Sequence, residues 1–216
     1  MTIRPIYLIS FTPPNDPGII HLPMLATNWR HPTIDLTRYD GIILTSKNGI
    51  EALERIDPAW KSVPVLCVGK ATQRRAEELG CKVLAVSDGY GNGFYDIVRT
   101  RYADKRWLYA RPKVVASDFA QRLRDDGIAV EEAVVYETRC EAKKVTEKIA
   151  ENAVLIFTSP SAVACFQSWF DFHPAQGIVV IGHTTGKSVP DRPVHVAQEP
   201  TVASCISLAK QLAKEP

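Results

Sequence analysis

The residues best placed to do chemistry in this sequence are serines that follow short apolar runs. Ser46 follows the run Ile-Ile-Leu-Thr at 42–45, and Ser159 follows Leu-Ile-Phe-Thr at 155–158 and precedes Pro160. Each serine closes an expected strand and opens an expected helix, where its hydroxyl would cap the helix N-terminus. Such a terminus offers unpaired backbone N–H groups and a partial positive charge, which suit a carboxylate or a phosphate. The alternative at either position is a cap with no ligand.

A second set of hydroxyls repeats together with the first. Thr72 comes after Gly69, and Thr184 and Thr185 come after Gly182. The distance along the chain from Gly69 to Gly182 equals that from Ser46 to Ser159. Ligands of open α/β sheets bind at the carboxyl ends of the strands, so we expect these hydroxyls to lie beside the serines. Four cationic side chains are expected near the same edge: Lys47, Arg111, Lys113 and Lys187. A lone lysine, however, is more often a solvated surface residue than a ligand-binding one.

The elements that must position these residues alternate along the chain. Short β-branched runs alternate with segments of helical periodicity, which predicts an α/β fold with parallel sheets. We expect strands at 6–9, 19–22, 41–44, 63–68, 82–86, 106–110, 129–136, 154–157, 178–181 and 194–196. Gly80 and Gly127 should end helices as left-handed caps.

The pattern of strand, Ser46 and Thr72 recurs later in the chain with Ser159 and Thr185, and this repeat predicts two domains. The second copy supplies only three expected strands, so the two N-terminal strands are needed to complete its sheet. We therefore expect a discontinuous domain of residues 1–26 and 138–216, with residues 27–137 inserted into it. Two crossings near 24–27 and 135–139 would form a two-stranded hinge with a cleft between the domains. The proline-rich segment 12–18 should hold no helix.

Composition excludes several classes of protein. The chain has 216 residues, 45% hydrophobic and 23% charged, as in globular proteins. Its apolar runs are far shorter than the roughly 20 residues that span a bilayer, so we expect no membrane contact and a cytoplasmic location. A formal charge of +2 argues against nucleic acid as the main partner.

Motifs for metals, nucleotides and covalent catalysis are missing from the sequence. The five cysteines show no ligand spacing, and we expect all of them to be buried small apolar residues without a disulfide. The five histidines form no HxxxH pair, so we expect no metal. The segment 89–93 is interpreted as a flexible turn, because Phe94 replaces the last glycine of GxGxxG. We expect no cofactor and no nucleophilic serine of the GxSxG type.

Tyr136 is the remaining candidate. It ends the last expected strand of the inserted domain, at the predicted hinge. A phenol at that point would face the cleft, and a core aromatic is the alternative.

The ordered set of motifs resembles the uroporphyrinogen-III synthase family. The matching pieces lie at 39–50, 68–72, 108–111, 123–127, 135–138, 157–161, 181–185 and 199–201. The resemblance implies two flavodoxin-like domains joined by a two-stranded hinge. It also implies cyclisation of the linear tetrapyrrole hydroxymethylbilane to uroporphyrinogen III in haem biosynthesis, with loss of water, inversion of ring D and no metal or organic cofactor.

The resemblance also assigns site residues. Tyr136 matches the tyrosine proposed to assist loss of the substrate hydroxyl. The substrate-binding set becomes Thr45, Ser46, Lys47, Asn48, Thr72, Arg111, Thr158, Ser159, Ser161, Thr184, Thr185 and Lys187. Expected partners are the substrate and, transiently, the deaminase that supplies it, with the chain acting as a monomer.

The sequence departs from the family pattern at three places, and other functions stay open. Segment 12–18 replaces a helix, Pro112 stands where glycine is common, and His183 stands where proline is common. The main alternative is a non-catalytic two-domain module that closes on a small anion. A nucleotide-sugar transferase is a third option, which the missing nucleotide motifs disfavour.

Overall fold

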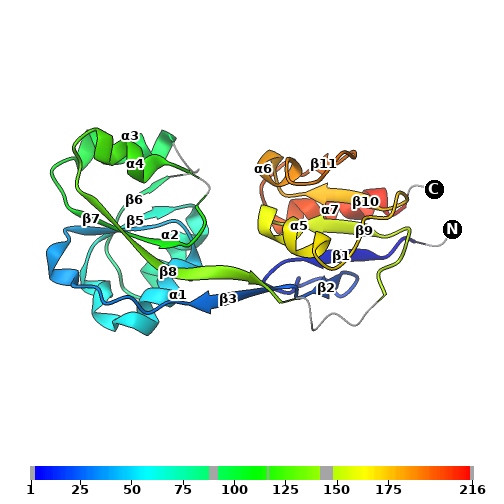
Figure 1. Ribbon diagram of the computed structural model, residues 1–216, viewed down its shortest axis with the longest axis horizontal. Coiled ribbons are helices and arrows are strands. Elements are labelled where there is room, and N and C mark those ends of the chain that lie inside the picture. The colour runs from blue at the N-terminus through cyan, green and yellow to red at the C-terminus, as the bar shows by residue number, and fades with distance from the viewer. Residues whose placement is uncertain (1–2, 88–91, 116, 142–147, 215–216) are drawn as a thin grey trace. The chain divides into compact units, whose positions relative to one another are not determined.

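The computed structural model describes residues 3–87, 92–115, 117–141 and 148–214 (Figure 1). Its contacts divide the chain into two compact units. The split unit consists of Met1–Ala26 and Thr138–Pro216, and the inserted unit consists of Thr27–Glu137. No helix in the described residues is long and apolar enough to cross a membrane.

The split unit contains one five-stranded sheet in which every strand is parallel to its neighbours. Its strands are β1 (Ile6–Ile9), β2 (Ile20–Leu22), β9 (Val154–Phe157), β10 (Gly177–Val180) and β11 (His195–Val196). Their spatial order is β11-β10-β9-β1-β2, which is the 2-1-3-4-5 order of flavodoxin. The helices are α5 (Pro160–Gln167), α6 (His183–Gly186) and α7 (Val202–Leu212). Between β1 and β2 the described chain forms no helix, as its prolines predict.

The inserted unit is built on a six-stranded sheet in the order β3-β8-β7-β4-β5-β6. Its strands are β3 (Leu25–Trp29), β4 (Gly41–Leu44), β5 (Val65–Val68), β6 (Val83–Ser87), β7 (Trp107–Pro112) and β8 (Val130–Cys140). The helices are α1 (Lys47–Ile56), α2 (Lys70–Glu78), α3 (Asn92–Arg101) and α4 (Phe119–Asp125), with the 3₁₀ turns η1 (Leu36–Arg38) and η2 (Pro58–Ser62). The predicted α/β class with parallel sheets is confirmed. The parallel strands β4 to β8 follow the order 3-2-1-4-5, which is the order of the first five strands of a Rossmann fold, because the chain returns across β4 before it forms β7.

Strands β3 and β8 lie side by side, and both pass from one unit into the other (Figure 1). The Arg30 N–H donates to the Val135 carbonyl at 2.9 Å, and the Glu141 N–H donates to the Met24 carbonyl at 2.7 Å. Residue numbers rise along one strand as they fall along the other, so the pair is antiparallel. The strands listed from the sequence did not include β3, because its Ala-Thr-Asn-Trp stretch has no apolar alternation, although its range overlaps the crossing expected near 24–27.

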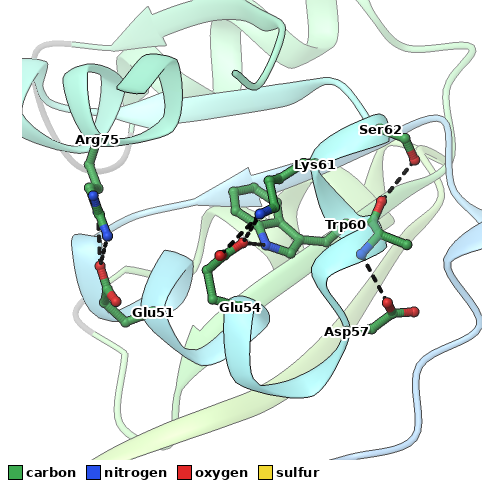
Figure 2. A network of polar contacts seen from close by, with 8 residues as sticks. Glu51, Glu54, Asp57, Trp60, Lys61, Ser62 and Arg75 are labelled. Atoms are coloured by element: carbon green, nitrogen blue, oxygen red, sulfur yellow. Dashed lines mark hydrogen bonds and ion pairs between the residues drawn. The ribbon is translucent and has the colours of Figure 1, made fainter. Parts of the chain in front are cut away.

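Helix α1 is fixed by polar contacts to the segments that follow it, as Figure 2 shows. The indole N–H of the fully buried Trp60 donates to Glu54 Oε1 at 2.7 Å, and Lys61 Nζ donates to Glu54 Oε2 at 3.1 Å. Arg75 of α2 donates to Glu51 Oε1 at 2.9 Å. These contacts hold the first helix after β4 against η2 and α2.

Two local predictions are confirmed and one is wrong. Gly80 (φ +83°) and Gly127 (φ +79°) have the left-handed backbone of the expected helix caps. Cys140 and Cys165, however, form a disulfide, whereas the sequence reasoning expected none. Cys140 is also exposed at the end of β8, so the expectation that all five cysteines are buried is wrong at this position. The end of β8 and the inner face of α5 come together only in the fold, so spacing along the chain could not reveal the pair. The other three cysteines are buried free thiols, as expected: Cys67, Cys81 and Cys205. The expected turn at 89–93 lies largely outside the described residues, and α3 begins at its end.

Candidate active site

The strand order defines a switch point in each sheet. In the inserted unit, α1 follows β4 and packs on one face of the sheet, while α4 follows β7 and packs on the other. The split unit changes direction between β1 and β9. A crevice forms outside the carboxyl ends of the two strands at such a point, and open α/β proteins bind their ligands there. The two repeated Thr-Ser segments directly follow β4 and β9, so each repeat stands at a switch point.

Ser46 caps α1 and also contacts a phenol. Its backbone is extended (φ −161°, ψ 160°), and its Oγ accepts a hydrogen bond from the Gly49 N–H at 3.4 Å. The same Oγ lies 2.7 Å from the hydroxyl oxygen of Tyr136. A Cβ at position 49 would stand 3.3 Å from the Ala110 carbonyl oxygen, so glycine lets the first turn of α1 approach β7 closely. The N-cap predicted from the sequence is confirmed, and its contact with Tyr136 is added by the fold.

A β-bulge aims the side chain of Tyr136. Arg111 of β7 pairs with Val134 of β8, but the next residue, Pro112, pairs with Tyr136. Val135 is therefore the extra residue of a bulge, a device that redirects side chains. Tyr136 joins the buried cluster beneath α1 and is only 6% exposed. Its carbonyl accepts from the Lys113 N–H at 2.9 Å, which fixes the backbone beside the bulge.

A second hydroxyl pair lies on the other side of the β4 terminus. Thr45 Oγ1 is 3.5 Å from the hydroxyl of Tyr109, and both residues are buried. Burial raises the pKa of Tyr109 to about 12, so this phenol stays neutral at physiological pH. The sequence reasoning missed Tyr109, although its place near the carboxyl end of an expected strand could have indicated it.

The predicted cations at the end of β7 are engaged within the inserted unit. Arg111 Nε lies 3.1 Å from Glu132 Oε1 as an ion pair without hydrogen-bond alignment, and Arg111 Nη1 donates to the carbonyls of Pro112 and Lys113 at 2.9 and 3.1 Å. Lys113 Nζ lies 3.4 Å from Glu137 Oε2. These pairings reduce the positive charge that the two side chains present to an anion.

Glu137 is a buried carboxylate that the sequence reasoning did not single out. Its side chain is 8% exposed, and it accepts from Arg30 Nη2 at 2.9 Å and from Asn28 Nδ2 at 3.1 Å. A carboxylate in such a place needs several donors to offset its desolvation. Because Asn28 belongs to β3 and Glu137 to β8, the cluster joins the two strands directly beside Tyr136.

The remaining predicted residues of the inserted unit lie in the first turns of α1 and α2. Lys47 is exposed and Asn48 is half-buried at the start of α1. Thr72 is 5% exposed in the first turn of α2, so its hydroxyl faces inward. Gly69, with φ +77°, caps α2 without a side chain.

The split unit repeats the cap but not the phenol. Ser159 Oγ accepts from the Ala162 N–H at 3.2 Å and lies 3.0 Å from Ser161 Oγ. Thr158 Oγ1 donates to the Ile9 carbonyl at 3.3 Å, which ties β9 to β1 at the switch point. Across the short helix α6, Thr184 is exposed and Thr185 is buried, and Lys187 is exposed directly after it.

No group of three or more His, Cys, Asp or Glu side chains in the described residues could hold a metal ion. The described polar groups at the strand ends include hydroxyls, helix N-termini and, at the end of β7, the cations Arg111 and Lys113 paired with carboxylates. This arrangement suits carboxylate recognition and proton donation by a neutral phenol.

The fold and the site together define a two-unit α/β protein with a hydroxyl-bearing switch point in each sheet. The chain belongs to the uroporphyrinogen-III synthase family, a family of cyclising lyases, because the family model described as "Uroporphyrinogen-III synthase HemD" matches residues 17–207. The resemblance of its sequence motifs to that family is therefore confirmed.

Solved structures share the fold. The chain is 24% identical to uroporphyrinogen-III synthetase from Helicobacter pylori 26695, with a TM-score of 0.80 over 97% of this chain and 99% of the other. A mutant uroporphyrinogen III synthase from the extremely thermophilic bacterium Thermus thermophilus is 15% identical, with a TM-score of 0.57 over 92% and 90% of the two chains. No curated protein matches the sequence.

Proposed function

We propose that this protein is a uroporphyrinogen-III synthase. It would close hydroxymethylbilane into uroporphyrinogen III, with inversion of ring D and loss of water. The observation that carries this proposal is the Ser46–Tyr136 pair, 2.7 Å apart at the switch point of the inserted unit, in a chain of this family. The pair favours an enzyme rather than a module that only closes on an anion. Ser46 would cap helix α1 equally well without the phenol of Tyr136 beside it.

The substrate is a polycarboxylate, and we propose that helix N-termini bind its side chains. Ser46 and Ser159 shape the termini of α1 and α5, where backbone N–H groups attract carboxylates. Each such contact contributes about 0.3–1 kcal/mol when exposed, so several must act together. Lys47 and Lys187, both exposed, would add attraction without a strongly basic chain.

Tyr136 is the proposed proton donor to the substrate hydroxyl. When that hydroxyl leaves as water, the substrate becomes a cationic azafulvene, which its own terminal pyrrole attacks to form a spiro intermediate. Rearrangement of this intermediate inverts ring D, and loss of the pyrrole proton balances the proton that left with water. The protein positions the acid and holds the substrate in a folded conformation in which the reacting carbons meet.

Several finer statements belong to this proposal. We propose that the split and inserted units are the two domains of the enzyme, that it acts in the cytoplasm as a monomer, and that it takes its substrate from the deaminase. The other proposed binding residues are Thr45, Asn48, Thr72, Arg111, Thr158, Ser161, Thr184 and Thr185. The inward-facing Thr45 and Thr72 and the paired Arg111 would act mainly by shaping the backbone at the strand ends.

The test supplies freshly generated hydroxymethylbilane and separates the oxidised product isomers. The uncatalysed reaction gives the type I isomer, so the type III isomer is expected only with the enzyme. Tyr136→Phe should lower turnover by about 10²-fold or more, the range of general acid catalysis. Tyr102→Phe is the matched control, because its phenol donates to the Leu84 carbonyl at 3.2 Å and packs on Trp107 at the opposite end of β7. Type I product alone from the wild-type protein would refute the proposal.

A further inference from the structure

We infer that Ser46 is a positioning residue that donates its hydroxyl proton to the phenol oxygen of Tyr136 and so directs the phenol's own proton towards the substrate. This inference rests on the proposed function and adds a second residue to the proton-donating step. It assigns Ser46 a role beyond the carboxylate contact expected from its sequence.

The direction of the hydrogen bond follows from the helix cap. A serine hydroxyl has one proton and two acceptor lone pairs. One lone pair of Ser46 faces the Gly49 N–H, in a region of positive potential at the start of α1. The serine proton is repelled from that region and must point away from the helix. The Tyr136 oxygen lies at 2.7 Å, a normal O–H···O distance, and is the acceptor that this orientation meets.

The consequence for the phenol is greater acidity and a fixed orientation. As Tyr136 releases its proton to the leaving hydroxyl, negative charge grows on the phenol oxygen. A hydrogen bond from Ser46 stabilises that charge, and the N-terminus of α1 supports it from behind. The phenol is nearly buried, so water screens this interaction little.

The repeated unit shows that the cap alone does not account for this contact. Ser159 occupies the same place after β9 and caps α5 in the same way, but its hydroxyl lies against Ser161. The two copies share the helix cap and differ in the neighbouring group. The inference therefore concerns the inserted unit alone.

Three substitutions at Ser46 separate the cap from the donor. Ser46→Ala removes both functions, and Ser46→Thr retains both. Ser46→Asp retains a capping oxygen for the Gly49 N–H but can no longer donate to the phenol. Thr201→Ala serves as the matched control for cap loss, because Thr201 caps α7 by accepting from the Ser204 N–H at 3.1 Å.

We expect kcat for type III formation to fall about 10- to 100-fold in Ser46→Ala and in Ser46→Asp, less than the roughly 10²- to 10⁴-fold of direct acid catalysis, because Ser46 acts through Tyr136. Ser46→Thr should stay within a few-fold of wild type, and Thr201→Ala should lose stability while keeping kcat. KM is measured separately, because the charge of Ser46→Asp also repels an anionic substrate.

A double variant makes the inference independent of stability. If Ser46 acts through Tyr136, adding Ser46→Ala to Tyr136→Phe should change kcat no further. Normal kcat in Ser46→Asp, or a full additional loss in the double variant, would overturn the inference. In that case type III formation by the wild-type protein and its loss in Tyr136→Phe would still support the proposed function. Absence of type III product from the wild-type protein would instead overturn the function, and the inference with it.

Discussion

Reduction of the Cys140–Cys165 disulfide should destabilise the split unit by about 3.5 kcal/mol. The bond joins the end of β8 to α5 across a sequence separation of 25 residues. Breaking it frees a loop of that length in the unfolded chain, and the chain-entropy relation for such a loop gives roughly 3.5 kcal/mol at 25 °C. The folded state should change little, because Cys165 stays packed in the core of the split unit.

The assay is urea unfolding followed by far-ultraviolet circular dichroism, with and without a thiol reductant. For a slope near 1–3 kcal/mol per molar urea, the transition of the split unit should move down by roughly 1.2–3.5 M. Thiol titration of the unfolded oxidised chain should detect Cys67, Cys81 and Cys205, and reduction should expose the other two cysteines.

A chain with both Cys140→Ala and Cys165→Ala is the control. It should unfold at the same urea concentration whether or not the reductant is present. Equal midpoints for the oxidised and fully reduced wild-type protein would refute the reasoning, because loop closure would then contribute nothing to stability.

Three further predictions concern the inserted unit. Gly41→Ala should cost about 3 kcal/mol in urea unfolding, because the new Cβ would stand 2.2 Å from the buried ring of Trp107; a loss below about 0.5 kcal/mol would contradict this packing. Tyr109 should make the free energy of unfolding fall between about pH 10 and 12, since its pKa is raised from 10.0 to about 12 and the unfolded chain loses this proton first. In alkaline unfolding, Tyr109→Phe should lack roughly 2–3 kcal/mol of that fall. Identical pH profiles for the two proteins would show that Tyr109 does not cause the fall. Glu137→Gln should lower the free energy of unfolding by about 1–2 kcal/mol, a value discounted because the partner Arg30 is nearly half exposed. High salt should shrink the difference in melting temperature between the variant and the wild type. An unchanged melting temperature in the variant would show that the buried charge is not stabilising.

Features that depend on a few consecutive residues were open to prediction from the sequence. Ser46 and Ser159 cap helices because a serine after an apolar run and before a helix has an oxygen near free N–H groups, whatever lies farther away. Gly80 and Gly127 end helices because glycine adopts positive φ at little cost. The alternation of these local signals was enough to indicate an α/β fold with parallel sheets.

Features of the site that join distant segments could not be read in this way. The pairing of Ser46 with Tyr136 depends on a bulge at Val135, which exists only because β7 and β8 pair with a shift in register. Arg111 was expected to face a ligand, yet the fold sets it against Glu132 of the neighbouring strand.

The sequence by itself determined which residues end strands, cap helices and carry hydroxyls, because short-range backbone and side-chain preferences decide these properties. The tertiary structure decided which of those residues meet. The order of strands brings the β4 terminus to the switch point, and the bulge then turns Tyr136 towards Ser46. The contact joins residues 90 positions apart. Its formation depends on packing and register summed over the whole sheet, and no short stretch of sequence contains that information.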